Sequence, residues 1–355
     1  MKAKNLPILF VLLILALLMA ACTATTSEET SPTEPASAVD EMPAEQPYFV
    51  YVSPNPLGVN EFLKMGQTGL EAAGAKYNAK VKVLESEDPV TREENVRAAV
   101  NDGADVVVVL GFEFSDIIPK VAVEAPDTTF LIVDQCIDNP PKNVYCALFR
   151  EHEAAFLIGA EAGLLTKTNK VGTIGALDIP FLHRYTDAFA EGAKYVNPNV
   201  ETSTLWVGGD NPFSDPVRSK EQALALADQG FDNIFAATAG GNFGIFEAAK
   251  EKNVYSYGVD VNQCVNAPGF VVDNLLKKVD VALQKAVDAI MNKDTNQVQV
   301  YGLKEGGIGL AATSEADLKS TQCVIADNPD VVEKIKELQT KIINGEITIE
   351  DPMFK

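Results

Sequence analysis

The chain has 355 residues, of which 50 are acidic and 29 basic, and its formal net charge at pH 7 is −21. A surface this acidic repels phosphate, and no basic run compensates for it, which argues against nucleic acid as a partner. The length beyond the N-terminal region fits two lobes of ordinary domain size.

The first 47 residues predict an export signal followed by a tether. Lys2 and Lys4 precede an apolar run over residues 6–21 that is too short to span a bilayer, which is typical of a secretory signal peptide (1–21). The letters LMAAC resemble a bacterial lipobox, which predicts a lipid anchor, such as palmitate, on Cys22; an ordinary cleaved signal or an uncleaved anchor is the alternative. Residues 22–47 lack apolar periodicity and predict a disordered tether.

Strand-like apolar runs then alternate with helical patterns. Strands are expected over residues 49–52, 81–84, 105–111, 129–134 and 144–149, and helices over 60–77, 92–101 and 115–123. The run DVVVVLG at residues 105–111 is apolar almost throughout, as parallel strands buried on both faces are.

A second series of the same kind follows. Its helices are expected over residues 151–166, 181–195, 216–229 and 245–252, and its strands over 170–176, 202–207, 233–239 and 254–259. This alternation predicts right-handed βαβ units, and hence an α/β fold with two doubly wound parallel-sheet lobes and a ligand cleft between them. We assign residues 48–148 plus about 267–298 to lobe 1, and 149–266 plus about 299–355 to lobe 2.

The stretch from residue 254 to 283 carries the first candidate site residues. Asp260 ends a strand, at the edge of a parallel sheet where ligands bind. A short run over 270–272 is expected to lead into a long amphipathic helix with Lys277 and Lys278 in its first turns. A carboxylate and an ammonium near one rim suit hydroxyls and polar ring atoms, whereas a turn cap and solvated helix charges are the simpler reading.

Other candidates also follow predicted strands. Asp134 ends TFLIVD as Asp260 ends YSYGVD, so each series places a carboxylate at a strand mouth. Phe62 and Phe213 lie in connections rich in Gly, Pro and Asn, where two rings could sandwich an aromatic base, although a Phe is more often core. The turn GGNFG, with Gly240 and Gly241, fits a tight wall against a ligand better than a phosphate loop.

Catalysis and metal binding find little support. The sequence has no GxSxG elbow, no His beside a Ser or Cys in a recognisable spacing, and only two histidines, so neither a triad nor a zinc site is expected. Four cysteines remain besides Cys22, namely Cys136, Cys146, Cys264 and Cys323. Disulfides and buried free thiols are both open, with Cys136 and Cys146 the nearest pair in sequence.

Four segments resemble the basic membrane protein (Bmp) family of bacterial purine-nucleoside-binding lipoproteins. They are IVDQCIDNPPKNVYCALFREHEAAFLIGA, GALDIPFLHRYTDAFAEGAKYVNPN, GGNFGIFEAAKEKNVYSYGVD and VVDNLLKKVDVAL. The likeness runs from about residue 49 to 309 and implies the type I periplasmic-binding-protein fold. The chain departs from the family pattern at Ser53, where an acidic contact is common, and in the DNLL segment before Lys277.

The resemblance also implies roles for single residues. By position, Phe62 and Phe213 stack on the base and Asp134 hydrogen-bonds base atoms. Asp260 accepts the ribose hydroxyls, and Lys277 reaches the ligand from the following helix. The implied site is completed by Gly240 and Gly241 at the ligand wall and by Asn60 as a further polar contact.

The expected function is that of a monomeric, lipid-anchored receptor on the outer face of the cell membrane, facing the periplasm or the cell exterior. It would need no cofactor, bind a purine nucleoside between its lobes and deliver it to an ABC permease with its ATPase. A receptor for a sugar or another small polar ligand is the first alternative, and a ligand-sensing surface lipoprotein without a transport role is the second. An enzyme such as a nucleoside hydrolase ranks below both.

Overall fold

The computed structural model describes residues 46–320 and 322–354, so the predicted signal peptide, Cys22 and the tether up to residue 45 lie outside the described residues. Residues Glu45–Lys355 form one compact unit. Within the described ranges, no helix is both long and apolar enough to cross a membrane.

The first sheet has six strands in the order β11-β5-β4-β3-β1-β2, all paired in parallel. Their bounds are β1 (Tyr48–Ser53), β2 (Lys80–Glu85), β3 (Val106–Leu110), β4 (Thr129–Val133), β5 (Val144–Phe149) and β11 (Val298–Tyr301). The central strands β1 and β3 are buried along their whole length, as their apolar sequences require.

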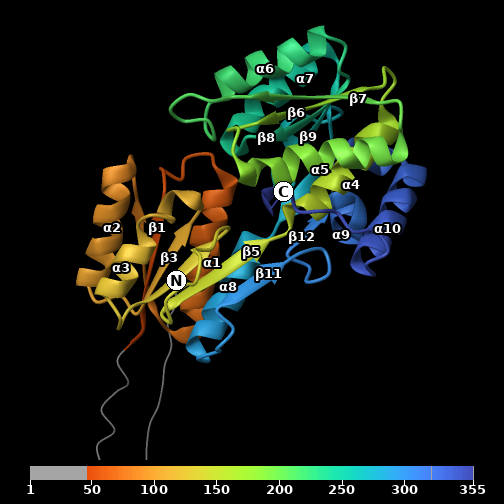
Figure 1. Ribbon diagram of the computed structural model, residues 1–355. Coiled ribbons are helices and arrows are strands. Elements are labelled where there is room, and N and C mark those ends of the chain that lie inside the picture. The colour runs from red at the N-terminus through yellow and green to blue at the C-terminus, as the bar shows by residue number, and fades with distance from the viewer. Residues whose placement is uncertain (1–45, 321, 355) are drawn as a thin grey trace, which may run out of the picture. The chain divides into compact units, whose positions relative to one another are not determined.

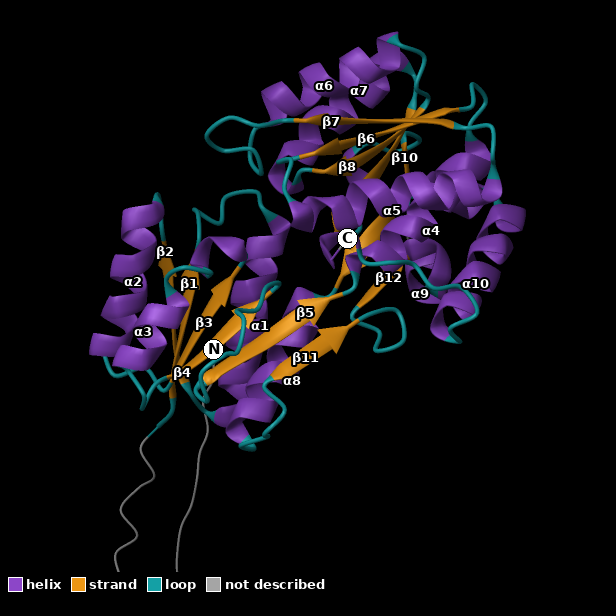
Figure 2. Ribbon diagram, viewed as in Figure 1, coloured by secondary structure: helices purple, strands orange, loops and turns teal. Residues whose placement is uncertain are grey.

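The second sheet also has six strands, in the order β12-β10-β9-β8-β6-β7. Its strands are β6 (Lys170–Gly175), β7 (Glu201–Trp206), β8 (Asn233–Ala237), β9 (Tyr255–Asp260), β10 (Val271–Lys277) and β12 (Ile308–Leu310). Only the edge strand β12 runs antiparallel to its described neighbour. Figure 2 shows the strands of the two sheets as separate groups.

Helices cover both faces of each sheet (Figure 1). Beside the first sheet lie α1 (Glu61–Tyr77), α2 (Pro89–Asn101), α3 (Ile118–Glu124) and α8 (Val279–Met291). Beside the second lie α4 (Glu151–Leu165), α5 (Pro180–Val196), α6 (Pro216–Asp228) and α7 (Asn242–Lys252), with α9 (Glu315–Ser320) and α10 (Pro329–Ile343) later in the chain. The predicted α/β class with two parallel-sheet lobes is therefore confirmed.

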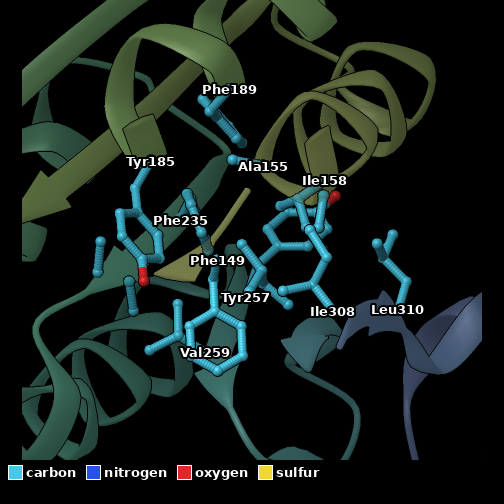
Figure 3. Packing of buried hydrophobic residues seen from close by; sticks show 14 of the residues in the cluster. Phe149, Ala155, Ile158, Tyr185, Phe189, Phe235, Tyr257, Val259, Ile308 and Leu310 are labelled. Atoms are coloured by element: carbon cyan, nitrogen blue, oxygen red, sulfur yellow. The ribbon is translucent and has the colours of Figure 1, made fainter. Parts of the chain in front are cut away.

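Close packing of α4 on α5 shapes the second lobe. Gly159 and Gly192 face the partner helix so closely that a Cβ at Gly159 would overlap the carbonyl oxygen of Phe189. The core beneath them is aromatic, and the rings of Phe189 and Phe235 stack with centroids 5.5 Å apart (Figure 3). Tyr185 lies on the same side of α5, and its ring contacts that of Phe235 in the same core.

Two boundaries differ from the expected lobe ranges. Residues 267–298 were expected in lobe 1, but β10 pairs with β9 in the second sheet, and only α8 packs on the first lobe. Conversely, β11 belongs to the first sheet although lobe 2 was expected from about residue 299. The polar residues Asp273 and Asn274 interrupt the apolar run, so the sequence does not predict a strand there. Both are buried and hydrogen-bonded in the structure. Asp273 accepts hydrogen bonds from the backbone N–H groups of Ala311 and Ala312.

The four described cysteines form two disulfides. Cys136 is bonded to Cys146 beside the first sheet, and Cys264 is bonded to Cys323, which ties the segment before α10 to the loop after β9. These four cysteines are therefore disulfide-bonded and not free thiols, as is common in exported proteins.

Candidate ligand site

A cavity lies at the C-terminal strand ends of both sheets, where parallel α/β folds place ligands. About 640 Å³ of space lies outside the protein atoms at this site, including the part that is open to solvent. Its lining residues are Pro54, Asn55, Asn60, Phe62, Leu63, Gly111, Phe112, Glu113, Asp134, Phe181, Leu182, Tyr185, Phe213, Ala237, Ala239, Val259, Asp260 and Lys277.

Most of the residues singled out from the sequence meet in this cavity, namely Asn60, Phe62, Asp134, Phe213, Asp260 and Lys277. Gly240 and Gly241 do not line it, whereas the preceding Ala239 does. A Cβ at Gly240 would lie 3.2 Å from the carbonyl oxygen of Phe213, so this glycine lets the turn approach the Phe213 loop from behind. The expected role of Gly240 and Gly241 at the ligand wall stays a prediction.

The two strand-end aspartates share a local backbone geometry. Asp134 has a φ of 81° and Asp260 a φ of 71°, both in the left-handed region that few residues other than Gly, Asn and Asp adopt. The chain turns sharply at each strand end, and each carboxyl group reaches the cavity. Burial raises the pKa of Asp134 to about 7 and that of Asp260 to about 6, in both cases against the field of Lys277.

Lys277 is the cation of the site, and its side chain is only 1% exposed. The ammonium forms an ion pair with Asp134, lies 2.8 Å from Glu151 Oε1 and donates to the Tyr185 hydroxyl at 3.2 Å. Burial opposes the charge of Lys277, yet the carboxylates of Asp134 and Glu151 hold its pKa well above the usual range. We expected Lys277 in the first turn of a helix, but it is the last residue of β10, and α8 begins at Val279.

Aromatic rings surround the same ammonium group. The Lys277 Nζ atom lies 4.9 Å from the ring centroid of Phe149, 5.2 Å from that of Phe62 and 5.4 Å from that of Phe181. These distances suit cation–π attraction, which strengthens where water is excluded. The ring of Phe62 is therefore held beside the charged end of the cavity.

Glu151 continues the ionic network away from the cavity. This fully buried residue pairs with Arg184 (Nη1 to Oε2, 3.2 Å), and Arg184 in turn pairs with Asp351 (Nη2 to Oδ2, 2.6 Å). Although burial alone would raise the pKa of Glu151, the charges of Lys277 and Arg184 hold it below the usual value. Lys277 is thus fixed in place by a chain of ion pairs that reaches the last residues of the protein.

Several residues of the cavity and of its ion-pair network were not predicted from the sequence. Phe112 packs against Phe213 with ring centroids 6.2 Å apart, and Glu113 follows it directly. Both come just after Gly111, at the end of the most apolar predicted strand, so their position at a strand mouth could have identified them. Glu151 and Tyr185 lie in helices with many similar residues, and no local pattern marks them.

Asn60 combines two contacts. Its Oδ1 atom accepts a hydrogen bond from the Leu63 backbone N–H at 3.3 Å and so caps α1, while the residue lines the cavity. As for metals, no group of three or more potential ligands occurs among the residues that the structure describes.

Comparison with known proteins gives consistent matches. Residues 51–352 match the model of the Bmp family, described as "ABC transporter substrate-binding protein PnrA-like". Basic membrane protein A of Borreliella burgdorferi is 30% identical over 259 residues, which cover 70% of this chain and 71% of that protein. The ABC transporter nucleoside-binding protein BmpA of Lactococcus lactis is 29% identical over 82% of this chain and 86% of its own length. Among solved structures, a solute-binding protein of an ABC transporter system from Aeropyrum pernix K1 superposes with a TM-score of 0.74 at 25% identity, covering 86% of this chain and 94% of that one.

Proposed function

Because the chain belongs to the PnrA-like family of ABC transporter substrate-binding proteins, whose members are extracytoplasmic binding proteins and not enzymes, we propose that it binds a purine nucleoside and delivers it to an ABC permease. One observation carries the proposal. A single cavity combines aromatic rings with the strand-end carboxylates Asp134 and Asp260. The name of the nucleoside-binding relative from Lactococcus lactis points to the same class of ligand.

Phe62 and Phe213 would hold the base between their rings. Phe62 comes from the first turn of α1 and Phe213 from the loop before α6, so the two rings approach from different lobes. Aromatic rings attract a planar base by offset stacking and by excluding water. Closing the lobes would complete the sandwich, because each lobe carries one of its faces.

Asp260 and Lys277 would hold the ribose, and Asp134 would contact the base. Asp260 keeps part of its surface exposed in the cavity and can accept hydrogen bonds from the ribose hydroxyls. Asn60 would add its amide N–H group, since only its Oδ1 atom is used by the helix cap.

The charges of the cavity favour a nucleoside over a nucleotide. Asp134, Asp260 and Glu113 all line it, and the one lysine that does so is neutralised by Asp134 and Glu151. A phosphate group would therefore meet carboxylates without a free cation among the described lining residues. We expect guanosine 5′-monophosphate to bind at least about tenfold more weakly than guanosine.

A lipid anchor on Cys22 is part of the same proposal and rests on the sequence alone. It would keep the receptor beside its permease outside the cytoplasm. Metabolic labelling of the expressed protein with a palmitate analogue tests this, and the label should disappear in the Cys22→Ala variant. Labelling that persists in this variant would contradict the proposed anchor.

A thermal-shift screen tests the proposed ligand class. Residues 45–355, which form a compact unit, would be melted with nucleosides, free bases, ribose and common sugars, because a ligand that binds only the folded state raises the melting temperature. A shift with a purine nucleoside but not with ribose supports the proposal. A shift with a sugar alone would replace the ligand, and no shift with any compound would favour a surface sensor for another ligand.

A further inference from the structure

Glu113 is a second carboxyl group of the first lobe that faces the cavity. It lies in the short helix η1 (Phe112–Phe114), immediately after β3, and lines the cavity. Its side chain folds back over Gly111, where its Oε2 atom fills the space that a Cβ would need. Gly111 itself has a φ of 93°, so glycine permits the backbone turn and also leaves room for the Glu113 carboxylate to fold back over it. The carboxyl group is thereby held at the strand end.

Unlike Asp134, Glu113 has no ion-pair partner among residues 46–320 and 322–354. The charge of Arg92 acts on Glu113, but its guanidinium group is engaged elsewhere, because its Nε atom donates to the Pro54 carbonyl at 2.8 Å and its Nη2 atom to Asn55 Oδ1 at 3.1 Å. Burial raises the pKa of Glu113, and this effect outweighs the hydrogen bond from its own backbone N–H and the charge of Arg92. A donor supplied by the ligand would add to the hydrogen bond from the backbone N–H.

The position of Glu113 identifies the part of the ligand that it would meet. Phe112, its neighbour in η1, contacts the ring of Phe213, one of the two proposed stacking residues. Asp260 and Lys277, the proposed ribose contacts, come from the ends of β9 and β10 in the second sheet. Glu113 follows β3, and Asp134, the proposed base contact, follows the neighbouring strand β4, which places Glu113 on the base side of the cavity.

We propose that Glu113 is a specificity-determining residue that accepts hydrogen bonds from the edge of the base and selects guanine. This inference rests on the proposed function. Guanine presents two adjacent donors, N1–H and the 2-amino group, which match the two oxygens of one carboxylate. Hypoxanthine lacks the amino group, adenine presents a lone pair at N1, and xanthine replaces the amino group by a carbonyl. The expected order of affinity is guanosine, then inosine, then adenosine, with xanthosine the weakest.

Calorimetric titration of these four nucleosides into residues 45–355 tests the inference. A matched pair of donors on a base gives discrimination of roughly five- to hundredfold, so the wild-type protein should prefer guanosine over adenosine by about that factor. Glu113→Gln keeps the shape but replaces one acceptor by a donor, which should reduce the preference for guanosine over adenosine at least about fivefold. Glu113→Ala should reduce it as well, and a thermal melt of each variant verifies folding.

Glu94→Gln is the matched control, because it removes the same charge from an exposed position on α2, away from the cavity. It should leave the order of the four nucleosides unchanged. If the wild type binds nucleosides but Glu113→Gln keeps the wild-type ratio of guanosine to adenosine affinity, the inference is overturned and the proposed function stands. If the wild type binds no nucleoside, both are overturned.

Discussion

The ammonium group of Lys277, at the end of β10, pairs with the carboxyl group of Asp134, which directly follows β4, so that one contact joins the strand ends of the two sheets. Glu151 lies 2.8 Å from the same ammonium and stands where the chain passes from β5 into α4. The cation of the cavity is thus anchored at a connection between the lobes.

Replacing Lys277 by Met should destabilise the protein strongly. The variant keeps the length of the side chain but leaves Asp134 and Glu151 buried without a cation, a change that costs about 3–5 kcal/mol when one partner of a buried pair is removed. Urea denaturation measures the free energy of unfolding. Lys278→Met, one residue later and exposed, is the control and should change it by less than about 0.5 kcal/mol. Equal stabilities of the two variants would refute the anchoring role.

Replacing Asp260 by Ala should weaken nucleoside binding without unfolding the protein. The ribose hydroxyls would lose their acceptor in a closed cavity, which costs about 1–3 kcal/mol per buried group. Calorimetry with guanosine measures the loss, and Asp210→Ala, an exposed change in the same lobe, should leave the affinity unchanged. Wild-type affinity in Asp260→Ala would remove this residue from the site.

The C-terminal ion pair should make stability depend on pH on the acid side. Burial opposes ionisation of Asp351, but the hydrogen bond and charge of Arg184 hold its pKa below the usual value. A lowered pKa in the folded state means that the stabilisation is complete at neutral pH and is lost as the pH falls through the usual and then the folded-state pKa.

Asp351→Asn should therefore be less stable than the wild type at pH 7, by about 1–3 kcal/mol, and the difference should shrink as the pH approaches 3. Denaturation at several pH values measures it, with the exposed Asp327→Asn as the control. A difference that stays constant between pH 7 and pH 3 would speak against the ionic contribution of Asp351.

The buried carboxyl groups of Glu161 and Asp273 should make the protein less stable as the pH rises, which is opposite to the effect of Asp351. Both are fully buried, and burial raises the pKa of Asp273 to about 6 and that of Glu161 well above its usual range. The folded protein then holds protons that the unfolded chain releases, so stability should fall as the pH rises from about 4 through 6 and beyond. The slope is about 1.4 kcal/mol per pH unit for each proton.

The side chains of Glu161 and Asp273 interact, and the charge of Asp273 adds to burial in raising the pKa of Glu161. Glu161→Gln mimics the protonated acid, because its amide can donate to Asp273 as the carboxylic acid would. This variant should therefore lose less stability than the wild type between pH 6 and pH 8. If the melting temperatures of the two proteins change by the same amount between pH 6 and pH 8, Glu161 carries no bound proton in the folded state.

Much of the fold could be predicted because alternating strand and helix patterns are local. The apolar run at β3 and the helical pattern over residues 60–77 identify their elements without tertiary information. β10 could not be identified in the same way, because Asp273 and Asn274 look like loop residues until their buried hydrogen-bond partners are known. The error at β10 also placed Lys277 in a helix.

The candidate site likewise contains residues that could be predicted from the sequence and residues that could not. Asp134, Asp260 and Phe213 follow strands or lie in loops of distinctive composition, so their position at a strand mouth could be predicted. Glu151 and Arg184 reach the network only because α4 packs on α5, a contact between segments about 30 residues apart that no local pattern encodes. The turn with Gly240 and Gly241 is distinctive in sequence, but the packing of Gly240 against the Phe213 loop becomes visible only in the structure.

A crystal structure of residues 45–355 grown with guanosine tests the central claim most directly. We predict a base between the rings of Phe62 and Phe213, with the ribose hydroxyls within hydrogen-bond distance of Asp260 and the Lys277 ammonium near the ligand. A cavity without nucleoside at saturating guanosine, or a nucleoside bound elsewhere on the protein, would contradict it.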